Sequence, residues 1–221
     1  MDINIIIPKE IYEQKLKDKT ITYWENAGDF YNGGYFDGKY ITLDYLSLVA
    51  DRGNEPTRFA LQDSIIAFDR TGKVADLIKK VGTYNTDSIK ENAIRFLSQF
   101  EAWNWYCKEA VKKNNRYLLD VSVSKLVLFA GRLILLENKS MFPYHKWFIK
   151  MLEKVEQKPV DFIPKLQCLL SNKSLDNIRE FYECVKNYKD WAEGEKYSWT
   201  SHFVYDIETV WTRQEEFIEN I

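Results

Sequence analysis

Two patterns of hydrophobic and polar residues divide the chain near residue 83. In the first third, short β-branched and aromatic runs alternate with turn signals, which is typical of strands. In the remainder, apolar residues recur at the three- to four-residue spacing of amphipathic helices. We therefore expect an α+β fold with two domains: a small mixed sheet with helices over residues 1–83, incomplete at its start, and a C-terminal helical bundle over residues 84–221.

The first domain is expected to contain several short elements. A buried strand covers residues 2–7 and ends at Pro8, since proline cannot donate a ladder hydrogen bond. The other expected elements are strands at 21–24, 40–48 and 63–69, and helices at 9–17 and 73–81.

The second domain is expected to be helical throughout. One helix covers residues 87–114, with Thr86 as its cap. The next, 116–138, is apolar over most of its circumference and should be central in the bundle. Shorter helices are expected at 143–155, 161–171, 174–192 and 203–218, with Ser174 capping the third of them.

Charge is nearly balanced, since Lys and Arg total 31 and Asp and Glu total 33. A domain that binds long nucleic acid normally carries a clear excess of Lys and Arg, so such a partner is not expected. The longest apolar stretch, residues 126–131, is far too short to cross a bilayer. We expect a cytoplasmic protein with no membrane partner.

The acidic start of the chain is the first candidate for chemistry. Asp2 and Asn4 would lie on one face of a strand, because side chains alternate with a period of two. Two carboxylates in such positions can hold Mg²⁺ through oxygen ligands. Here the second position carries a neutral amide.

Short motifs in a fixed order carry a family resemblance. The chain resembles bacterial nucleotidyltransferase-domain proteins of the aminoglycoside-nucleotidyltransferase-like superfamily, which pair a small catalytic α/β domain with a helical bundle. The stretches that carry it are Asp2-Ile3-Asn4-Ile5-Ile6-Ile7-Pro8, Leu43-Asp44-Tyr45, Phe68-Asp69-Arg70-Thr71-Gly72-Lys73 and Phe142-Pro143-Tyr144-His145-Lys146-Trp147, with a weaker match over 203–211.

The resemblance implies a metal site and assigns its residues. Asp2 matches the first acid of the family, Asn4 the second, and Asp44 the third, on a later strand. Asp2 and Asp44 would then be the catalytic, metal-holding residues, with Mg²⁺ as the cofactor. The family's Gly-Ser phosphate turn precedes the acidic strand and has no counterpart in this sequence. Asp2 could equally be a solvated residue.

Nucleotide contacts are expected from three further residues. Asn4 would orient a phosphate or sugar, Lys146 would approach a phosphate, and Tyr144 would stack on a base. The competing interpretation of the Tyr144–Lys146 cluster is a helix start, with Pro143 in the first turn.

Two functions therefore remain open. The first is Mg²⁺-dependent transfer of a nucleotidyl group from a nucleoside triphosphate to a small acceptor hydroxyl. The second is a non-catalytic module that binds a nucleotide or a protein, and the amide at position 4 leaves open whether the chain is an enzyme. We also consider a homodimer, because an exposed N-terminal strand edge can pair with a second copy.

Overall fold

The computed structural model describes residues 2–26, 33–213 and 215–221. It divides into two compact units. The sheet unit comprises Met1–Gly53 and Ala60–Thr83, and the helical unit comprises Asn54–Phe59 and Tyr84–Ile221. The expected α+β class is confirmed, while a nucleotidyltransferase-like arrangement stays a prediction.

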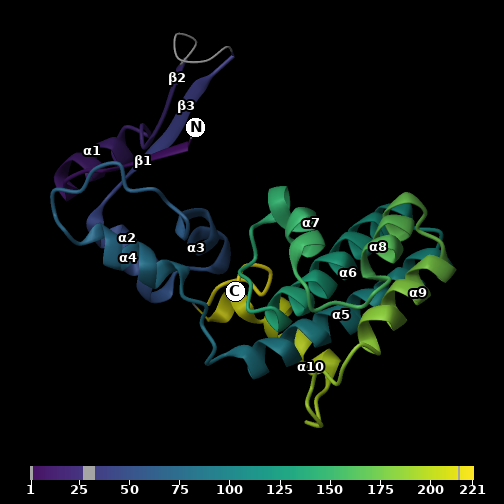
Figure 1. Cartoon of the computed structure of the whole chain (residues 1–221). Helices are drawn as coiled ribbons and strands as arrows, with labels where there is room; N and C mark the ends of the chain where they lie inside the picture. Colours follow the sequence, from purple (N-terminus) through teal and green to yellow (C-terminus); the bar gives the residue numbers. More distant parts are fainter. Residues whose placement is uncertain (1, 27–32, 214) are drawn as a thin grey trace. The chain divides into compact units, whose positions relative to one another are not determined.

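The sheet unit contains a three-stranded mixed sheet (Figure 1). Strands β1 (Asp2–Ile6), β2 (Thr22–Asn26) and β3 (Tyr35–Ile41) lie in the order β1-β3-β2. β1 runs parallel to β3, and β2 runs antiparallel to it. Helix α1 (Lys9–Lys17) joins β1 to β2. Its Lys15 Nζ lies 4.0 Å from the centre of the Tyr40 ring, so α1 is close to the face that carries Tyr40.

The core of the sheet unit is made by helices rather than by strands. Helices α2 (Leu43–Arg52), α4 (Val74–Gly82) and the end of α3 (Glu55–Leu61) supply its buried residues, which are Leu46, Val49, Ala50, Leu61, Val74 and Val81. Among the strand residues only Ile41 is buried. The prediction of a buried first strand was wrong: Ile5 is 38% exposed. Asp2, Asn4 and Asp37, which lie on the other face from Ile5, are exposed as well, so the sheet keeps that face open to solvent.

Two of the expected strands differ in the structure, one in part and one throughout. The run predicted at 40–48 divides, because β3 ends at Ile41 and α2 begins at Leu43. Thr42 causes the change, since its hydroxyl caps α2 by accepting a hydrogen bond from the Tyr45 amide at 3.0 Å. The run at 63–69 forms turns and bends, and the Asp69 carboxylate accepts a hydrogen bond from the amide of Thr71 at 2.7 Å.

The helical unit is built around two long helices, α5 (Ile89–Lys112) and α6 (Arg116–Glu137). They pack side by side (Figure 1), and the rings of Phe96 and Phe129 lie 6.3 Å apart between them. α6 is buried on all sides from Leu126 to Leu136, as its apolar sequence predicted. Gly131 allows a close approach of α7 (His145–Lys154), because a Cβ at that position would overlap the Phe148 ring.

The remaining helices surround this pair. They are α8 (Phe162–Ser171), α9 (Leu175–Lys186) and α10 (Trp199–Phe203), followed by a π-helix (Val204–Glu208) and a 3-10 turn (Val210–Thr212). The Ser174 cap is confirmed, since its Oγ accepts from the Asn177 amide at 3.2 Å. The helix predicted at 174–192 ends earlier, at Lys186. The stretch predicted as one helix at 203–218 contains the last residue of α10, the π-helix and the 3-10 turn. The N-cap position of α5 is Ser88 rather than Thr86, without a side-chain hydrogen bond there.

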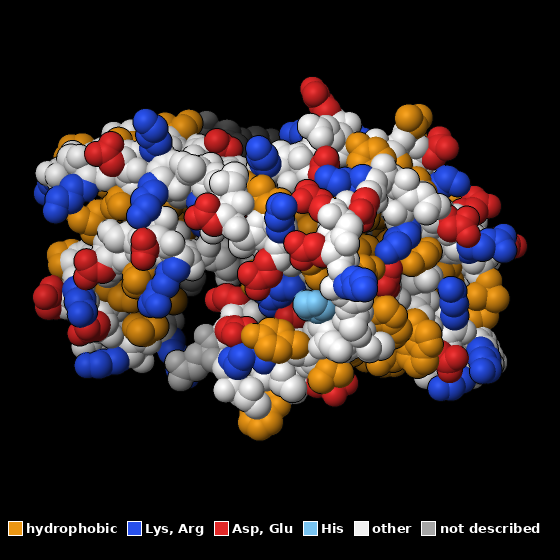
Figure 2. Space-filling view, turned by 90° about the horizontal axis from the view of Figure 1, so that it is seen from below, with side chains coloured by type: hydrophobic (Ala, Val, Ile, Leu, Met, Phe, Trp, Pro, Cys, Tyr) orange, Lys and Arg blue, Asp and Glu red, His pale blue; other side chains and the backbone are white. Residues whose placement is uncertain are grey.

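Positively and negatively charged side chains are interspersed on the face shown in Figure 2. Lys and Arg side chains alternate there with Asp and Glu side chains without a large area of one sign. Within the described residues, no helix combines the length and the apolar character that crossing a membrane requires.

Candidate functional site

The open face of the sheet brings together residues from all three strands. Asp2 of β1 lies directly beside Asp37 of β3, and Asp37 lies opposite Trp24 of β2. Residues paired in register point to the same side of a sheet. All three side chains are exposed, and they form one row across the face. Two carboxylates on neighbouring strands, beside an indole ring, are thus presented to solvent.

The next row on the same face holds Asn4 of β1, Lys39 of β3 and Thr22 of β2. Asn4 and Thr22 are exposed, and Lys39 is half-buried. A cation therefore lies one row away from the two carboxylates, next to the amide of Asn4. On the other side of the acidic row, the Tyr35 ring stacks on Trp24 with centres 6.3 Å apart and planes 26° apart.

On the opposite face of the sheet, a glycine lets β1 and β3 approach each other closely. Gly38 lies between Ile3 and Tyr23 in the register, and a Cβ there would overlap the Ile3 carbonyl oxygen. The absent side chain leaves room for Tyr23, whose hydroxyl donates to that carbonyl at 3.2 Å. Burial raises the pKa of the Tyr23 phenol, with the neighbouring Tyr40 and Asp37 as further causes, so the hydroxyl stays a donor at neutral pH.

Asp44 is not part of this face. It lies in the first turn of α2 and is exposed there, so the expectation that it follows the pattern of a strand was wrong. Asp44 comes three residues after Ile41, which pairs with Ile6 at the C-terminal end of β1. Asp2 lies at the N-terminal end of β1. Ile6 lies four residues along the strand from Asp2, which corresponds to roughly 13 Å. Asp37, rather than Asp44, is the carboxylate on a later strand that lies beside Asp2.

Sequence reasoning missed Asp37, although a signal was present. Residues 35–41 alternate between Tyr35, Asp37, Lys39 and Ile41 on one face and Phe36, Gly38 and Tyr40 on the other. This alternation is the strand period of two. The sequence interpretation began the next strand only at residue 40 and assigned no element to residues 25–39. Of these, residues 27–32 lie outside the described residues.

Tyr144 and Lys146 belong to the helical unit. Tyr144 stands at the N-cap of α7 with φ 62° and ψ 172°, a backbone region that residues other than glycine rarely adopt. Its ring packs 4.7 Å from the His145 ring and 6.2 Å from that of Phe142. Lys146 Nζ lies 5.4 Å from the centre of the exposed Trp147 ring. The alternative interpretation of this cluster, a helix start, is what the structure shows, with Pro143 just before the helix.

Beneath this segment, the helical unit contains a buried ion pair. Arg132 is 1% exposed, and its Nη2 lies 3.2 Å from Glu55 Oε2. The guanidinium is sandwiched between the rings of Phe96 and Phe142, each centred 4.7 Å from its Cζ. Burial raises the pKa of Glu55 despite the opposing effect of Arg132, and burial lowers the pKa of Arg132. The geometry is that of a structural anchor, since Arg132 is closed to solvent and Glu55 is only 16% exposed.

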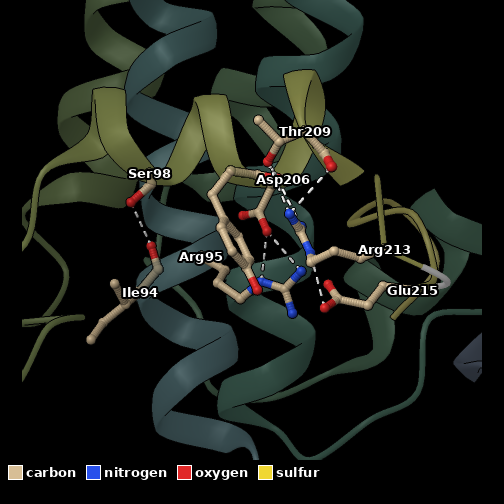
Figure 3. A network of polar contacts seen from close by, with 8 residues as sticks. Ile94, Arg95, Ser98, Asp206, Thr209, Arg213 and Glu215 are labelled. Atoms are coloured by element: carbon tan, nitrogen blue, oxygen red, sulfur yellow. Dashed lines mark hydrogen bonds and ion pairs between the residues drawn. The ribbon is translucent and has the colours of Figure 1, made fainter. Parts of the chain in front are cut away.

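A second buried network fixes the C-terminal segment on α5 (Figure 3). Arg95 Nε and Nη2 both donate to Asp206 Oδ1, at 3.0 and 2.7 Å. Asp206 lies in the π-helix and is fully buried. Arg213 lies over the Tyr205 ring, 3.6 Å from its centre, and donates to the carbonyls of Tyr205 and Thr209. These contacts hold the π-helix in place.

A small cavity of about 30 Å³ lies between the start of α5, the end of α6 and residues 189–195. Such a volume holds about two water molecules and is too small for a nucleotide. Four of its charged lining residues form ion pairs, Lys189 at 2.7 Å from Glu137 and Lys90 at 2.9 Å from Glu193, and Glu195 also lines the cavity. The open face of the sheet therefore remains the best candidate for a binding site.

No group of three or more His, Cys, Asp or Glu side chains in the described residues is arranged to hold a metal ion. The donors on the open face are instead the carboxylates of Asp2 and Asp37 and the amide oxygen of Asn4. Hard oxygen donors of this kind suit Mg²⁺, which takes few protein ligands and completes its shell with water and phosphate oxygens. A comparison with protein-family models finds no match, and searches of curated proteins and of solved structures find none either.

Proposed function

We propose that the open face of the sheet binds a nucleoside triphosphate together with Mg²⁺. The observation that supports this most directly is the register of β1 and β3, which places Asp2 beside Asp37 on one exposed face. The resemblance to the nucleotidyltransferase-domain proteins requires carboxylates on a first and a later strand. Asp2 and Asp37 meet that requirement, with Asp37 in the role that the sequence assigned to Asp44.

Each neighbouring side chain has a corresponding role. Asp2 and Asp37 would hold the metal, which would supply positive charge beside the phosphate oxygens. Lys39, beside Asn4 in the register, adds a positive charge for the phosphates. Trp24, 66% exposed and already stacked with Tyr35, offers a ring for the base. Stacking on an aromatic side chain contributes about 1–3 kcal/mol per base and tolerates any base.

The reaction that the resemblance implies is transfer of a nucleotidyl group to a small acceptor hydroxyl. Asn4 stands where that family carries a second acid, so the site has one negative charge fewer. Catalysis of phosphoryl transfer depends on positioning and charge, and the loss reduces both. Nucleotide binding without turnover is the second candidate, and this amide is the observation that favours it.

Titration calorimetry of the full chain with ATP and GTP, with and without Mg²⁺, tests the proposal. We expect Mg²⁺-dependent heat that Asp37→Asn and Asp2→Asn each weaken roughly ten- to hundredfold, since a charge-assisted contact contributes about 1.5–3 kcal/mol. Asp44→Asn is the matched control, because it makes the same chemical change at an exposed site in α2.

The outcomes are distinct. Loss of binding in Asp44→Asn alone would reject the assignment to Asp37 and return the third acid to position 44. No heat with either triphosphate would reject nucleotide binding. If binding is found, release of pyrophosphate on addition of hydroxyl acceptors separates a transferase from a binding module.

A further inference from the structure

The outer edge of β1 is unpaired within the described part of the sheet. β1 pairs on one side only, with β3. The Ile7 amide donates to the Ile41 carbonyl at 2.9 Å, so the peptide groups of residues 3, 5 and 7 face β3. Because these directions alternate along a strand, the N–H and C=O groups of Asp2, Asn4 and Ile6 face away from the sheet. Pro8, the next outward residue, has no N–H and ends the edge.

We propose that a second copy of this chain pairs with this edge, antiparallel, about a two-fold axis at Asn4. In this register Asn4 lies opposite Asn4 of the partner subunit, and Asp2 lies opposite the partner's Ile6. All outward groups of both strands then form hydrogen bonds, which gives six in total. If the two-fold axis lay at residue 3 or residue 5, only four of these six hydrogen bonds would form. If it lay at Asp2, the Asp2 carboxylates of the two copies would face each other.

The side chains of β1 suit this register. Ile3 lies opposite the partner's Ile5, which is the kind of apolar cross-strand pair that stabilises a sheet. Ile5 is 38% exposed in the single chain and gains cover. β1 itself carries no lysine and no proline, the residues that usually prevent edge pairing.

The same register explains the neutral residue at position 4. Side chains directly opposite each other on paired strands lie about 5 Å apart at Cβ, and like charges in such positions destabilise the pair. An acid at position 4 would face its own copy across the two-fold axis. Asparagine avoids this repulsion, and its amide can both donate to and accept from its counterpart.

Pairing of two five-residue strands forms a small interface, so we expect a weak dimer that dissociates on dilution. Interfaces below about 1,200 Å² belong to transient complexes. The six-stranded sheet that results would carry both candidate nucleotide faces on one side. The dimer does not depend on the proposed nucleotide site, and it is tested without nucleotide and with EDTA present.

The test is sedimentation equilibrium of the full chain with three substitutions. Wild type should show a mass that rises with concentration toward twice the monomer mass of 26.3 kDa. Asn4→Asp and Asn4→Lys should each raise the dissociation constant about tenfold, because each puts like charges across the axis. Thr22→Asp is the control, since it adds a carboxylate to the same row at the opposite edge of the sheet and should leave the dimer unchanged.

Mixing Asn4→Asp with Asn4→Lys gives the decisive result. Only an axis that passes through position 4 brings the two opposite charges together, so the mixture should recover the affinity that each variant alone has lost. A monomeric mass for wild type at all concentrations would overturn the proposal. So would an unchanged dissociation constant in both variants, or a mixture that associates no more tightly than either variant. Far-UV circular dichroism of each variant excludes unfolding as the cause.

Discussion

Replacing Glu55 by glutamine tests whether the buried ion pair anchors Asn54–Phe59 in the helical unit. Glu55 Oε2 accepts a hydrogen bond from the Phe142 amide at 2.7 Å and lies 3.2 Å from Arg132 Nη2. Glutamine has nearly the same shape and can still accept from Phe142. It removes only the negative charge, and the guanidinium still donates to the Glu219 carbonyl at 3.4 Å.

The expected loss follows from the burial of Arg132, which is 1% exposed. Breaking a buried pair by removing one partner costs about 3–5 kcal/mol, because the remaining charge is uncompensated. The Phe96 and Phe142 rings, each 4.7 Å away, continue to stabilise the cation, so the lower end of that range applies. We therefore expect Glu55→Gln to lower the free energy of unfolding by about 3 kcal/mol.

Urea unfolding at pH 7, followed by tryptophan fluorescence, measures this loss. Glu193→Gln is the matched control, since Glu193 is half-exposed in its pair with Lys90 at 2.9 Å. An exposed pair contributes at most about 1 kcal/mol, so the control should change little. A Glu55→Gln protein within about 1 kcal/mol of wild type would refute the anchoring role.

Arg132→Met examines the other half of the pair through pH. Burial already raises the pKa of Glu55, and removal of the cation raises that pKa further. A carboxyl group whose pKa is higher in the folded state than in the unfolded state stabilises the fold as pH falls through that folded pKa. The deficit of Arg132→Met relative to wild type should therefore shrink as pH is lowered from 7 toward 5. A deficit independent of pH would mean that lost packing, rather than a stranded carboxylate, causes it.

Three further predictions concern packing, thiols and alkaline pH. Gly131→Ala should lower stability by about 1–3 kcal/mol despite alanine's higher helix propensity, since its Cβ overlaps the Phe148 ring, and thermal unfolding measures the loss. The exposed Cys168 should react quickly with a thiol reagent, while Cys107, whose pKa burial raises to about 12, should react only after unfolding; fast labelling of both in native protein would contradict this. Stability should fall as pH rises above about 9, because burial raises the pKa of Cys107 and of Tyr182 and the unfolded chain then releases their protons first. Unfolding curves at pH 8 and 10 check this, and equal stability at the two values would contradict it.

The long helices were predictable because their local signals and their packing agree. The helix expected at 116–138 is found at Arg116–Glu137, and its uniformly apolar sequence matches burial on every side. Local capping also carries through, since Ser174 forms the expected cap. At the C-terminus this agreement fails: the chain after Phe203 is held by the long-range pair of Arg95 and Asp206, which no local pattern contains.

The candidate site was only half predictable for a related reason. Asp2 and Asn4 lie on β1 as their spacing indicated, but their neighbours depend on the order of strands in the sheet. The apolar content of residues 43–46 favoured a strand. The Thr42 hydroxyl instead caps a helix there by accepting a hydrogen bond from the Tyr45 amide. Asp44 was thereby removed from the sheet. Asp37 joined the site through a register that the linear sequence does not show.

Position 4 connects the two proposals and allows them to fail separately. For the metal site, Asn4→Asp adds a third oxygen anion beside Asp2 and Asp37, so Mg²⁺ should bind more tightly to the single chain. For the dimer, the same change places like charges across the two-fold axis and should weaken association. Tighter Mg²⁺ binding with unchanged association would reject the dimer alone, whereas weaker association without a gain in Mg²⁺ binding would reject the metal site alone. Asparagine at position 4 is thus expected if selection kept dimer formation and gave up one negative charge in the metal site.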